Sequence, residues 1–131
     1  MPKGILNENV KIVSMKKKVA IIGVTGSVGQ EFVQSLNDHP WFEVTQIAAS
    51  ERSAGKKYLD AIRDANGIVA WDVSGQIPDY IKEMKVLTID EIDITQLDLI
   101  FSAVESVAAR DIETKFAKDL PVISTSSAYR Y

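Results

Sequence analysis

The stretch Lys18-Val-Ala-Ile-Ile-Gly-Val-Thr-Gly-Ser-Val-Gly29 decides the fold, because an apolar run leads directly into a glycine-rich turn. Residues 19–24 form a continuous apolar run, apart from one glycine, which is typical of a parallel strand buried on both faces. Gly23, Gly26 and Gly29 follow at regular spacing, and a helical pattern begins at once. A strand, a tight turn and a helix N-terminus in this order predict a site for the pyrophosphate of a dinucleotide.

Each glycine of this turn has its own expected role. Gly23 permits the sharp change of direction between strand and helix, and Gly26 lets backbone N–H groups approach phosphate oxygens. Gly29 lets the helix pack closely against the strand. The hydroxyls of Thr25 and Ser27 add hydrogen-bond donors beside the turn. A glycine-rich turn without a ligand is the alternative, but its position between a buried strand and an amphipathic helix favours a phosphate site.

The rest of the chain alternates between strand and helix patterns. This alternation predicts an α/β fold, with a Rossmann-like, doubly wound, mostly parallel sheet and helices on both faces. The expected strands are 19–24, 42–49, 68–71, 86–89, 97–104 and 121–124. The expected helices are 27–37, 58–65, a helical turn at 79–85, and 105–118.

Apolar residues spaced four apart mark the helix faces that should be buried. In the first helix this stripe consists of Val28, Phe32 and Leu36. In the last helix it consists of Ala108, Ile112 and Phe116. Gln30 lies off the first stripe, so we expect it outside the buried face.

Composition and charge limit the class of protein. The chain has 131 residues, 46% of them hydrophobic and 25% charged, which fits one domain with a hydrophobic core. Its net charge of −3 gives no electrostatic reason to expect a nucleic-acid or anionic-membrane partner. Cysteine is absent, which excludes a disulfide framework and a thiolate zinc site. We expect a cytoplasmic protein, and we assign neither a catalytic residue nor a metal ligand.

The residues after the second expected strand bear on the choice of dinucleotide. Strand 42–49 leads into Ser50, Glu51, Arg52 and Ser53, where an NAD-binding protein usually has an acidic residue that holds the ribose 2′-hydroxyl. The guanidinium of Arg52 can donate two N–H groups to a phosphate, and the serine hydroxyls can donate as well. This pattern predicts NADP, although the charge of Glu51 would oppose a 2′-phosphate if it pointed inward. A solvated charged loop is the alternative.

Five motifs occur in order along the chain. They are Gly-Val-Thr-Gly-Ser-Val-Gly (23–29), Asn-Asp-His-Pro-Trp-Phe-Glu-Val (37–44), Ala-Ala-Ser-Glu-Arg-Ser-Ala-Gly-Lys-Lys (48–57), Phe-Ser-Ala (101–103) and Pro-Val-Ile-Ser-Thr-Ser-Ser-Ala-Tyr-Arg (121–130). Together they resemble aspartate-semialdehyde dehydrogenase of the archaeal and fungal type. The resemblance assigns residues 16–131 to an NADP-binding domain and residues 1–15 to an N-terminal extension.

The same resemblance implies which residues hold the cofactor. The pyrophosphate would be lined by Gly23, Thr25, Gly26, Ser27, Val28 and Gly29. The adenosine 2′-phosphate would be held by Ser50, Arg52 and Ser53. Ser102 and Ala103 would lie near the nicotinamide half, and Thr125 stands where the family commonly has an asparagine that contacts the cofactor.

The resemblance implies the reductive dephosphorylation of aspartyl phosphate to aspartate semialdehyde, in lysine, threonine and methionine biosynthesis. That reaction needs a cysteine thiolate from a second, catalytic domain, so we do not expect the chain to catalyse it alone. We also expect a homo-oligomer, because without a final helix one face of the parallel sheet would be partly uncovered. The alternatives are the cofactor domain of malonyl-CoA reductase or N-acetyl-glutamyl-phosphate reductase, and a non-catalytic NADP-binding sensor module.

Overall fold

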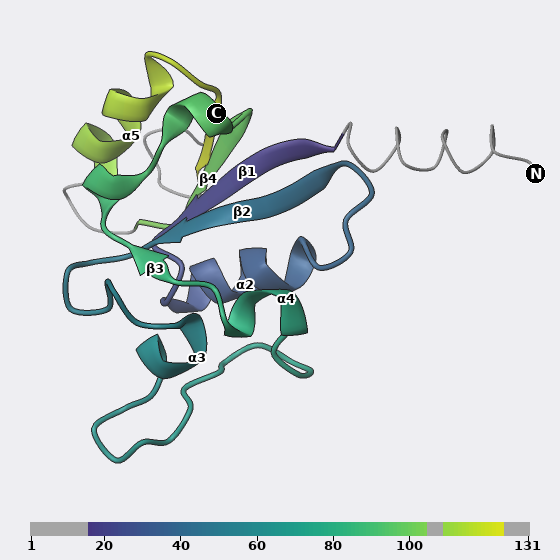
Figure 1. Ribbon diagram of the computed structural model, residues 1–131, viewed down its shortest axis with the longest axis vertical. Coiled ribbons are helices and arrows are strands. Elements are labelled where there is room, and N and C mark those ends of the chain that lie inside the picture. The colour runs from purple at the N-terminus through teal and green to yellow at the C-terminus, as the bar shows by residue number, and fades with distance from the viewer. Residues whose placement is uncertain (1–15, 105–108, 125–131) are drawn as a thin grey trace, which may run out of the picture.

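Five strands form one sheet in which every strand pair is parallel. The computed structural model describes residues 16–104 and 109–124. The strand order is β3-β2-β1-β4-β5, so the chain starts at the centre, builds one half of the sheet, and returns to build the other (Figure 1). The strands are β1 (Lys17–Ile22), β2 (Phe42–Ala48), β3 (Val86–Leu87), β4 (Leu99–Ser102) and β5 (Val122–Ser124).

The central strand β1 owes its position to its apolar sequence. Val19 and Ile21 are fully buried in one core cluster, and Ala20 and Ile22 are fully buried in a second cluster. Side chains alternate between the two faces of a strand, so these clusters lie on opposite sides of the sheet. Pairing with β2 on one edge and β4 on the other completes the burial, which is why the apolar run is continuous.

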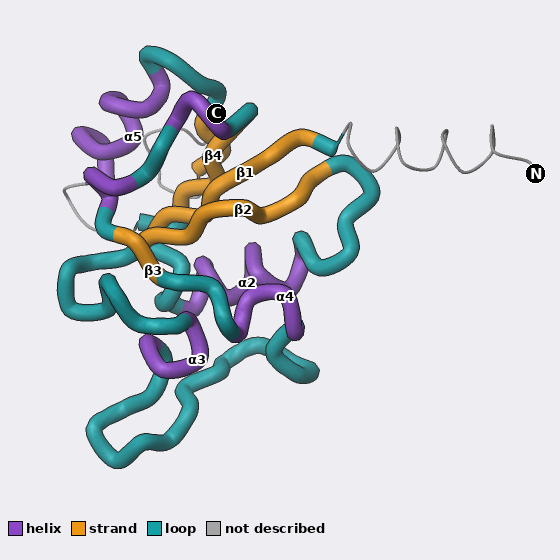
Figure 2. The backbone as a smooth tube through the Cα atoms, in the orientation of Figure 1, coloured by secondary structure: helices purple, strands orange, loops and turns teal. Residues whose placement is uncertain are grey.

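Helices cover both faces of this sheet, as the sequence pattern predicts. In the described residues they are α2 (Ser27–Ser35), α3 (Tyr58–Ala61), α4 (Asp79–Lys82) and α5 (Ala109–Ala117). The helices α2, α3 and α4 lie on one side and α5 on the other (Figures 1 and 2). Two short 3-10 turns, η1 (Ile89–Glu91) and η2 (Ile94–Gln96), contribute Ile89 and Ile94 to the cluster on the α5 side. The doubly wound arrangement is therefore confirmed.

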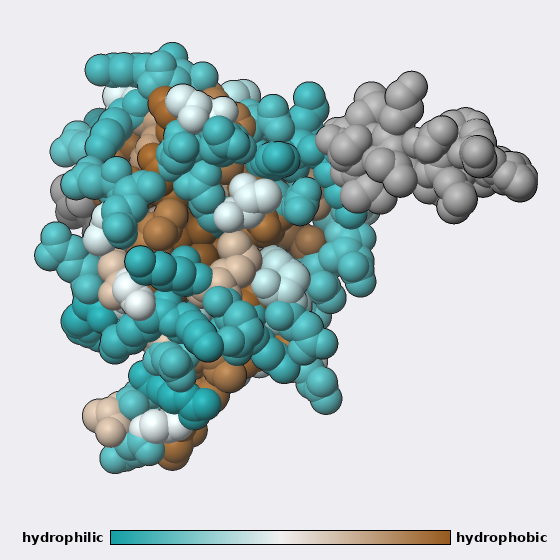
Figure 3. Space-filling model, in the orientation of Figure 1, coloured by the Kyte–Doolittle hydropathy of each residue, from teal (hydrophilic) through white to brown (hydrophobic). Residues whose placement is uncertain are grey.

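Hydrophilic side chains cover most of the surface seen in Figure 3, with apolar side chains visible between the elements. Across residues 16–104 and 109–124, every helix is too short or too polar to cross a bilayer. The same residues contain no cluster of three or more His, Cys, Asp or Glu side chains that could hold a metal ion.

The expected strand at 68–71 is wrong. This segment forms only an isolated antiparallel bridge between Val69 and Arg63, and Ile68 is 63% exposed. The carboxylate of Asp64 accepts a hydrogen bond from the backbone N–H of Ile68 at 3.0 Å, and the N–H of Asp64 donates to the carbonyl of Ile68 at 2.9 Å. These local bonds fold the segment into a turn, because Asp side chains compete with regular structure for backbone groups.

Helix boundaries also differ from the expected ranges. The helix α3 ends at Ala61 instead of at residue 65, before the turn around Asp64. The helix α2 ends at Ser35, and Asp38 shortly after it takes a φ of 55°, which stops a helix. The helix α5 begins at Ala109 in the described residues, and residues 105–108, where we expected it to start, lie outside them.

Two polar side chains are buried where the apolar spacing predicted otherwise. In α2, Gln30 is buried, whereas Val28 and Phe32 are only half-buried. In α5, Glu113 is fully buried, whereas Ile112 is half-buried. The last residue of each predicted stripe is buried as expected. Both polar side chains tolerate burial because their polar atoms have hydrogen-bond partners.

Candidate cofactor-binding site

Backbone hydrogen bonds hold the glycine turn at the end of β1. The N–H groups of Gly23 and Val24 both donate to the carbonyl of Ala48, at 2.9 and 3.1 Å. Gly23 has a φ of 73°, in the left-handed region, and a Cβ there would lie 2.9 Å from backbone atoms of Ala103. Position 23 therefore requires glycine. The turn itself is packed against the carboxyl ends of β2 and β4.

Gly29 and Gly26 are glycines for different reasons. A Cβ on Gly29 would lie 2.2 Å from the carbonyl oxygen of Gly23 and 2.7 Å from the backbone of Val24, so the close packing of α2 requires glycine. Gly26 has a φ of −77°, which any residue adopts, and a Cβ there would lie at an ordinary contact distance of 3.9 Å from the carbonyl oxygen of Gly23. The fold does not need glycine at position 26, and this open cradle fits the close approach of a phosphate to the backbone.

The N-terminus of α2 is suited to an anion. Its cap residue, Gly26, has no side chain that could accept the N–H groups of the first turn, and this turn carries no acidic residue. Thr25 precedes the cap, while Ser27 and the half-buried Val28 begin the helix. The hydroxyl of Ser27 donates to a carboxylate oxygen of Asp72 at 3.1 Å. The residues predicted to line a pyrophosphate therefore surround one helix N-terminus.

A cavity of about 360 Å³ lies beside this turn, at the carboxyl ends of the strands. Its lining residues come from the turn, the end of β2, η1, the segment after β4, and α5, and they are Gly23, Thr25, Gly26, Ala49, Ser50, Ile89, Ala103, Val104 and Ile112. The strand order reverses between β1 and β4, and open α/β sheets bind their ligands at such a switch point. The cavity brings five of the predicted cofactor residues together.

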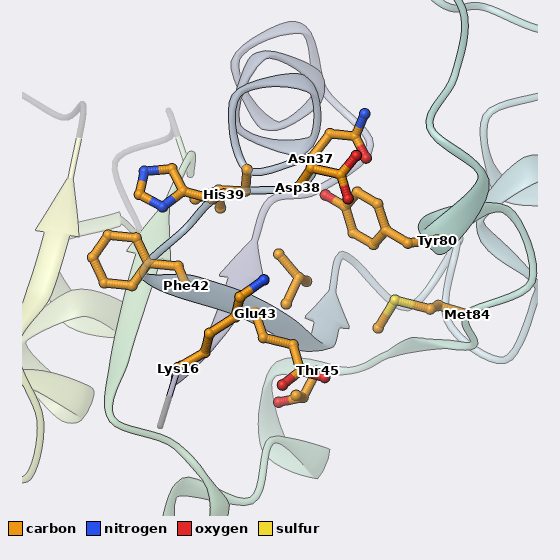
Figure 4. Close-up of a pocket in the computed structure, with 11 residues that line it drawn as sticks. Lys16, Asn37, Asp38, His39, Phe42, Glu43, Thr45, Tyr80 and Met84 are labelled. Atoms are coloured by element: carbon orange, nitrogen blue, oxygen red, sulfur yellow. The ribbon is translucent and has the colours of Figure 1, made fainter. Parts of the chain in front are cut away.

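A larger cavity of about 520 Å³ lies at the opposite end of the sheet, where β2 begins (Figure 4). Lys16, Asp38, His39 and Glu43 line it, together with Tyr80 from α4. It contains none of the predicted cofactor residues and sits at the amino end of β2. Because parallel sheets bind ligands at the carboxyl ends of their strands, the smaller cavity is the candidate cofactor site.

The loop after β2 folds against the carboxyl ends of β2 and β3. The carbonyl of Ser50 accepts hydrogen bonds from the N–H groups of Ser53 and Ala54, at 2.9 and 3.1 Å. Gly55 donates to the carbonyl of Val86 at 2.7 Å. These bonds place the loop next to the candidate site, with Ser50 in the cavity wall.

Arg52 and Glu51 are both exposed on this loop. Within the part of the chain that the structure describes, Arg52 takes part in no ion pair, so its guanidinium can turn toward a ligand. Ser50 lines the cavity, whereas Arg52 and Ser53 do not. Of the residues predicted for the 2′-phosphate, one therefore lines the cavity, and the other two follow it on the same loop.

The residues predicted for the nicotinamide half have different surroundings. Ser102 is fully buried, and its hydroxyl donates to the carboxyl group of Glu113 in α5. Ala103 lines the cavity, and its N–H donates to the carbonyl of Ile22 at 2.9 Å. Thr125 lies outside the described residues. Only Ala103 of these three therefore meets the candidate site directly in the described structure.

Gln30 supports the turn although no sequence pattern revealed it. Its side-chain amide donates to the carbonyl oxygens of Thr25 and Ala70, at 3.1 and 2.9 Å. Its amide oxygen accepts from the N–H of Asp72 at 2.7 Å. Gln30 thereby ties the glycine turn to a segment some 40 residues further along the chain, a partner that local spacing cannot indicate.

Tyr58 is a second buried support of the turn. Its side chain is fully buried, and its hydroxyl donates to the carbonyl of Val24 at 3.1 Å. Burial raises the pKa of Tyr58 above its ordinary value of 10.0, and burial raises the pKa of Tyr80 as well. Both tyrosines therefore stay neutral in the folded protein at pH values where exposed tyrosines ionise.

These pKa shifts predict a loss of stability at alkaline pH. Above about pH 10 the unfolded tyrosines ionise while the folded ones do not, so the unfolded state binds fewer protons and the free energy of unfolding falls as pH rises. The loss between about pH 8 and about pH 11 should be smaller in Tyr58→Phe, although that variant should be about 1 kcal/mol less stable at the lower pH. Urea unfolding at both pH values checks this. A variant with the same alkaline loss as the parent would contradict it.

The parallel sheet of this order, the glycine turn at its switch point and the adjoining cavity define a dinucleotide-binding domain of the Rossmann type. Residues 18–131 match the family described as "Semialdehyde dehydrogenase, NAD binding domain", and the chain belongs to this family.

Relatives of known name agree with this family. An aspartate-semialdehyde dehydrogenase of Archaeoglobus fulgidus is 43% identical over 117 residues, which cover 88% of this chain and 32% of the relative. The Aspergillus fumigatus protein of the same name is 39% identical over 116 residues, covering 88% of this chain and 30% of the relative. The chain thus spans about a third of the length of the relatives that it matches.

Solved structures give the same result. Aspartate semialdehyde dehydrogenase with NADP from Candida albicans matches with a TM-score of 0.76 and 37% identity, over 88% of this chain and 31% of that chain. RSP, a Rex-family repressor, matches with a TM-score of 0.55 at 14% identity and shares the fold alone. The family resemblance and the Rossmann-like fold expected from the sequence are both confirmed.

Proposed function

We propose that this chain is the NADP-binding domain of an aspartate-semialdehyde dehydrogenase and that it holds the pyrophosphate at the N-terminus of α2. The observation that carries the proposal is the open cradle at Gly26, since the fold itself does not require glycine there. The cradle adjoins the switch-point cavity, which Ser50 and Ala103 also line. Support also comes from the relatives, which are named aspartate-semialdehyde dehydrogenase and align with 88% of this chain. The structure of one of them was solved with NADP.

In the whole enzyme, the cofactor in its reduced form, NADPH, would supply the hydride for the reductive dephosphorylation of aspartyl phosphate to aspartate semialdehyde, leaving NADP⁺ and inorganic phosphate. The residues of this chain would bind and orient the cofactor, with the backbone N–H groups of Ser27 and Val28, at the start of α2, facing phosphate oxygens. These 131 residues contain no cysteine, so the thiolate that forms the covalent intermediate would come from another part of the enzyme.

The proposal includes a preference for NADP over NAD. Arg52 is exposed on the loop that begins at Ser50 in the cavity wall, and a guanidinium can donate two N–H groups to a phosphate. We therefore expect the chain to bind NADP⁺ more tightly than NAD⁺. The variant Arg52→Gln should bind NADP⁺ about tenfold more weakly and NAD⁺ unchanged, because only NADP⁺ carries the 2′-phosphate. Isothermal titration calorimetry with both dinucleotides measures this.

Arg110→Gln is the matched control, because Arg110 is an exposed arginine on α5, outside the lining of the cavity. Its affinities for both dinucleotides should equal those of the unaltered chain. Equal affinity of the unaltered chain for NADP⁺ and NAD⁺, or a preference for NAD⁺, would overturn the assignment of NADP. Failure to bind either dinucleotide would overturn the proposed function as a whole.

A further inference from the structure

Glu113 is a buried acidic residue that the cofactor site described above does not use. Its side chain is fully buried, and its Oε2 accepts hydrogen bonds from the hydroxyls of Ser102 and of Ser124, the latter at 2.6 Å. Burying a carboxyl group costs free energy that hydrogen bonds offset only in part, and a well-packed apolar side chain can fill such a space without loss of stability. The two hydroxyls that it joins therefore indicate a role in geometry.

The two serines occupy equivalent positions on neighbouring strands. Ser102 is the last residue of β4 and Ser124 is the last residue of β5, and the two are paired in the register of the sheet. By accepting both hydroxyls, Glu113 fixes these strand ends relative to α5. Ala103 follows Ser102 directly and lines the candidate cofactor cavity, so the position of this cavity wall depends on the same contacts.

This wall belongs to one half of the dinucleotide site. A Rossmann-type sheet holds the two mononucleotide halves on either side of its switch point. The pyrophosphate is assigned to Gly26, and Ser50 and Arg52 place the adenosine 2′-phosphate on the β2 side. The side formed by β4 and β5 is left for the nicotinamide half.

We propose that Glu113 is a positioning residue for the nicotinamide half of NADP. It touches no ligand itself, but holds Ser102 and Ser124 so that the ends of β4 and β5 form the surface on which that half lies. The inference rests on the proposed function, because it presupposes a dinucleotide in this cavity.

The affinities for two ligands, one with and one without the nicotinamide half, distinguish this positioning role from a purely structural one. Adenosine 2′,5′-bisphosphate has the adenosine and the 2′-phosphate of NADP⁺ but lacks the nicotinamide half. The variant Glu113→Gln keeps the side-chain volume but replaces one carboxyl oxygen by an NH₂ group, which brings two N–H donors into a buried site where two hydroxyls already donate to Oε2, so the hydrogen bonds at the strand ends must rearrange. We expect it to weaken NADP⁺ binding by about tenfold and to change the affinity for adenosine 2′,5′-bisphosphate by less than about twofold.

The variant Ser124→Ala removes one of the two hydroxyls. It should lose less affinity for NADP⁺ than Glu113→Gln and should likewise leave the affinity for adenosine 2′,5′-bisphosphate nearly unchanged. Asp111→Asn is the matched control, because it exchanges a carboxylate for an amide at an exposed position of the same helix, and it should change neither affinity. Calorimetric titration gives both affinities for each variant, and thermal unfolding shows whether each variant is folded.

The inference would be overturned if Glu113→Gln bound both ligands more weakly by the same factor, or if its affinity for NADP⁺ were unchanged. Either result would leave the proposed function intact. If Glu113→Gln does not fold, Ser124→Ala decides in the same way. If the unaltered chain binds neither ligand, the proposed function fails, and the inference falls with it.

Discussion

Replacing Gly26 with alanine is expected to weaken NADP⁺ binding by about a hundredfold while the fold stays intact. The backbone at Gly26 has a φ of −77°, and an added Cβ would lie 3.9 Å from the carbonyl oxygen of Gly23, an ordinary contact distance, so the folded protein accepts the methyl group. The same methyl group would occupy the space through which a phosphate oxygen reaches the N–H groups at the start of α2. Hydrogen bonds from these groups to a charged phosphate would then be lost.

Calorimetric titration with NADP⁺ measures the affinity, and thermal unfolding without ligand measures the stability of the same variant. We expect an unchanged melting temperature together with the loss of affinity. An affinity within about twofold of the unaltered chain would show that the phosphate does not approach the backbone at Gly26. The proposed location of the pyrophosphate would then be wrong.

Replacing Gly29 with alanine is expected to reduce stability, unlike the change at Gly26. We expect a loss of about 3 kcal/mol in the free energy of unfolding. A Cβ at this position would lie 2.2 Å from the carbonyl oxygen of Gly23 and 2.7 Å from two backbone atoms of Val24. All three atoms belong to the backbone, so no flexible side chain can move aside. The helix α2 would have to shift away from the end of β1.

Urea unfolding of this variant, with Gly26→Ala as its matched control, tests the requirement for close packing. Both variants add one methyl group to the same turn, so a difference between them reports the different surroundings of the two positions. A Gly29→Ala protein as stable as Gly26→Ala would contradict the packing of α2 on β1 described above.

The sequence patterns predicted the central part of the fold because its determinants are local. The apolar run before Gly23 and the glycine spacing after it specify a buried strand, a tight turn and a helix within a few residues. The alternation of patterns then specifies a parallel sheet with helices on both faces. The segment 68–71 was predicted wrongly because its apolar residues suggest a strand, while the carboxylate of Asp64 holds it in a turn.

The supports of the site could not be predicted in the same way. Gln30 bonds to Ala70, 40 positions away, and Glu113 bonds to Ser102 on a different element. Residue spacing reports which face of a helix is apolar, but it does not report which polar side chains find buried partners through the tertiary fold. The glycines and Ser50 could be predicted because the turn chemistry and the strand end are visible in the sequence itself, and Gly23, Gly26 and Ser50 do line the candidate cavity.

Amide chemical shifts of the isotope-labelled chain, recorded during a titration with NADP⁺, test most directly whether the dinucleotide binds at the carboxyl ends of the strands. We expect saturable shifts at Gly23, Gly26 and Ser27, together with Ser50 on the β2 side of the same cavity. Shifts confined to the larger cavity at the opposite end of the sheet, around His39 (Figure 4), would contradict the assigned site. The absence of any shift would contradict dinucleotide binding by this chain.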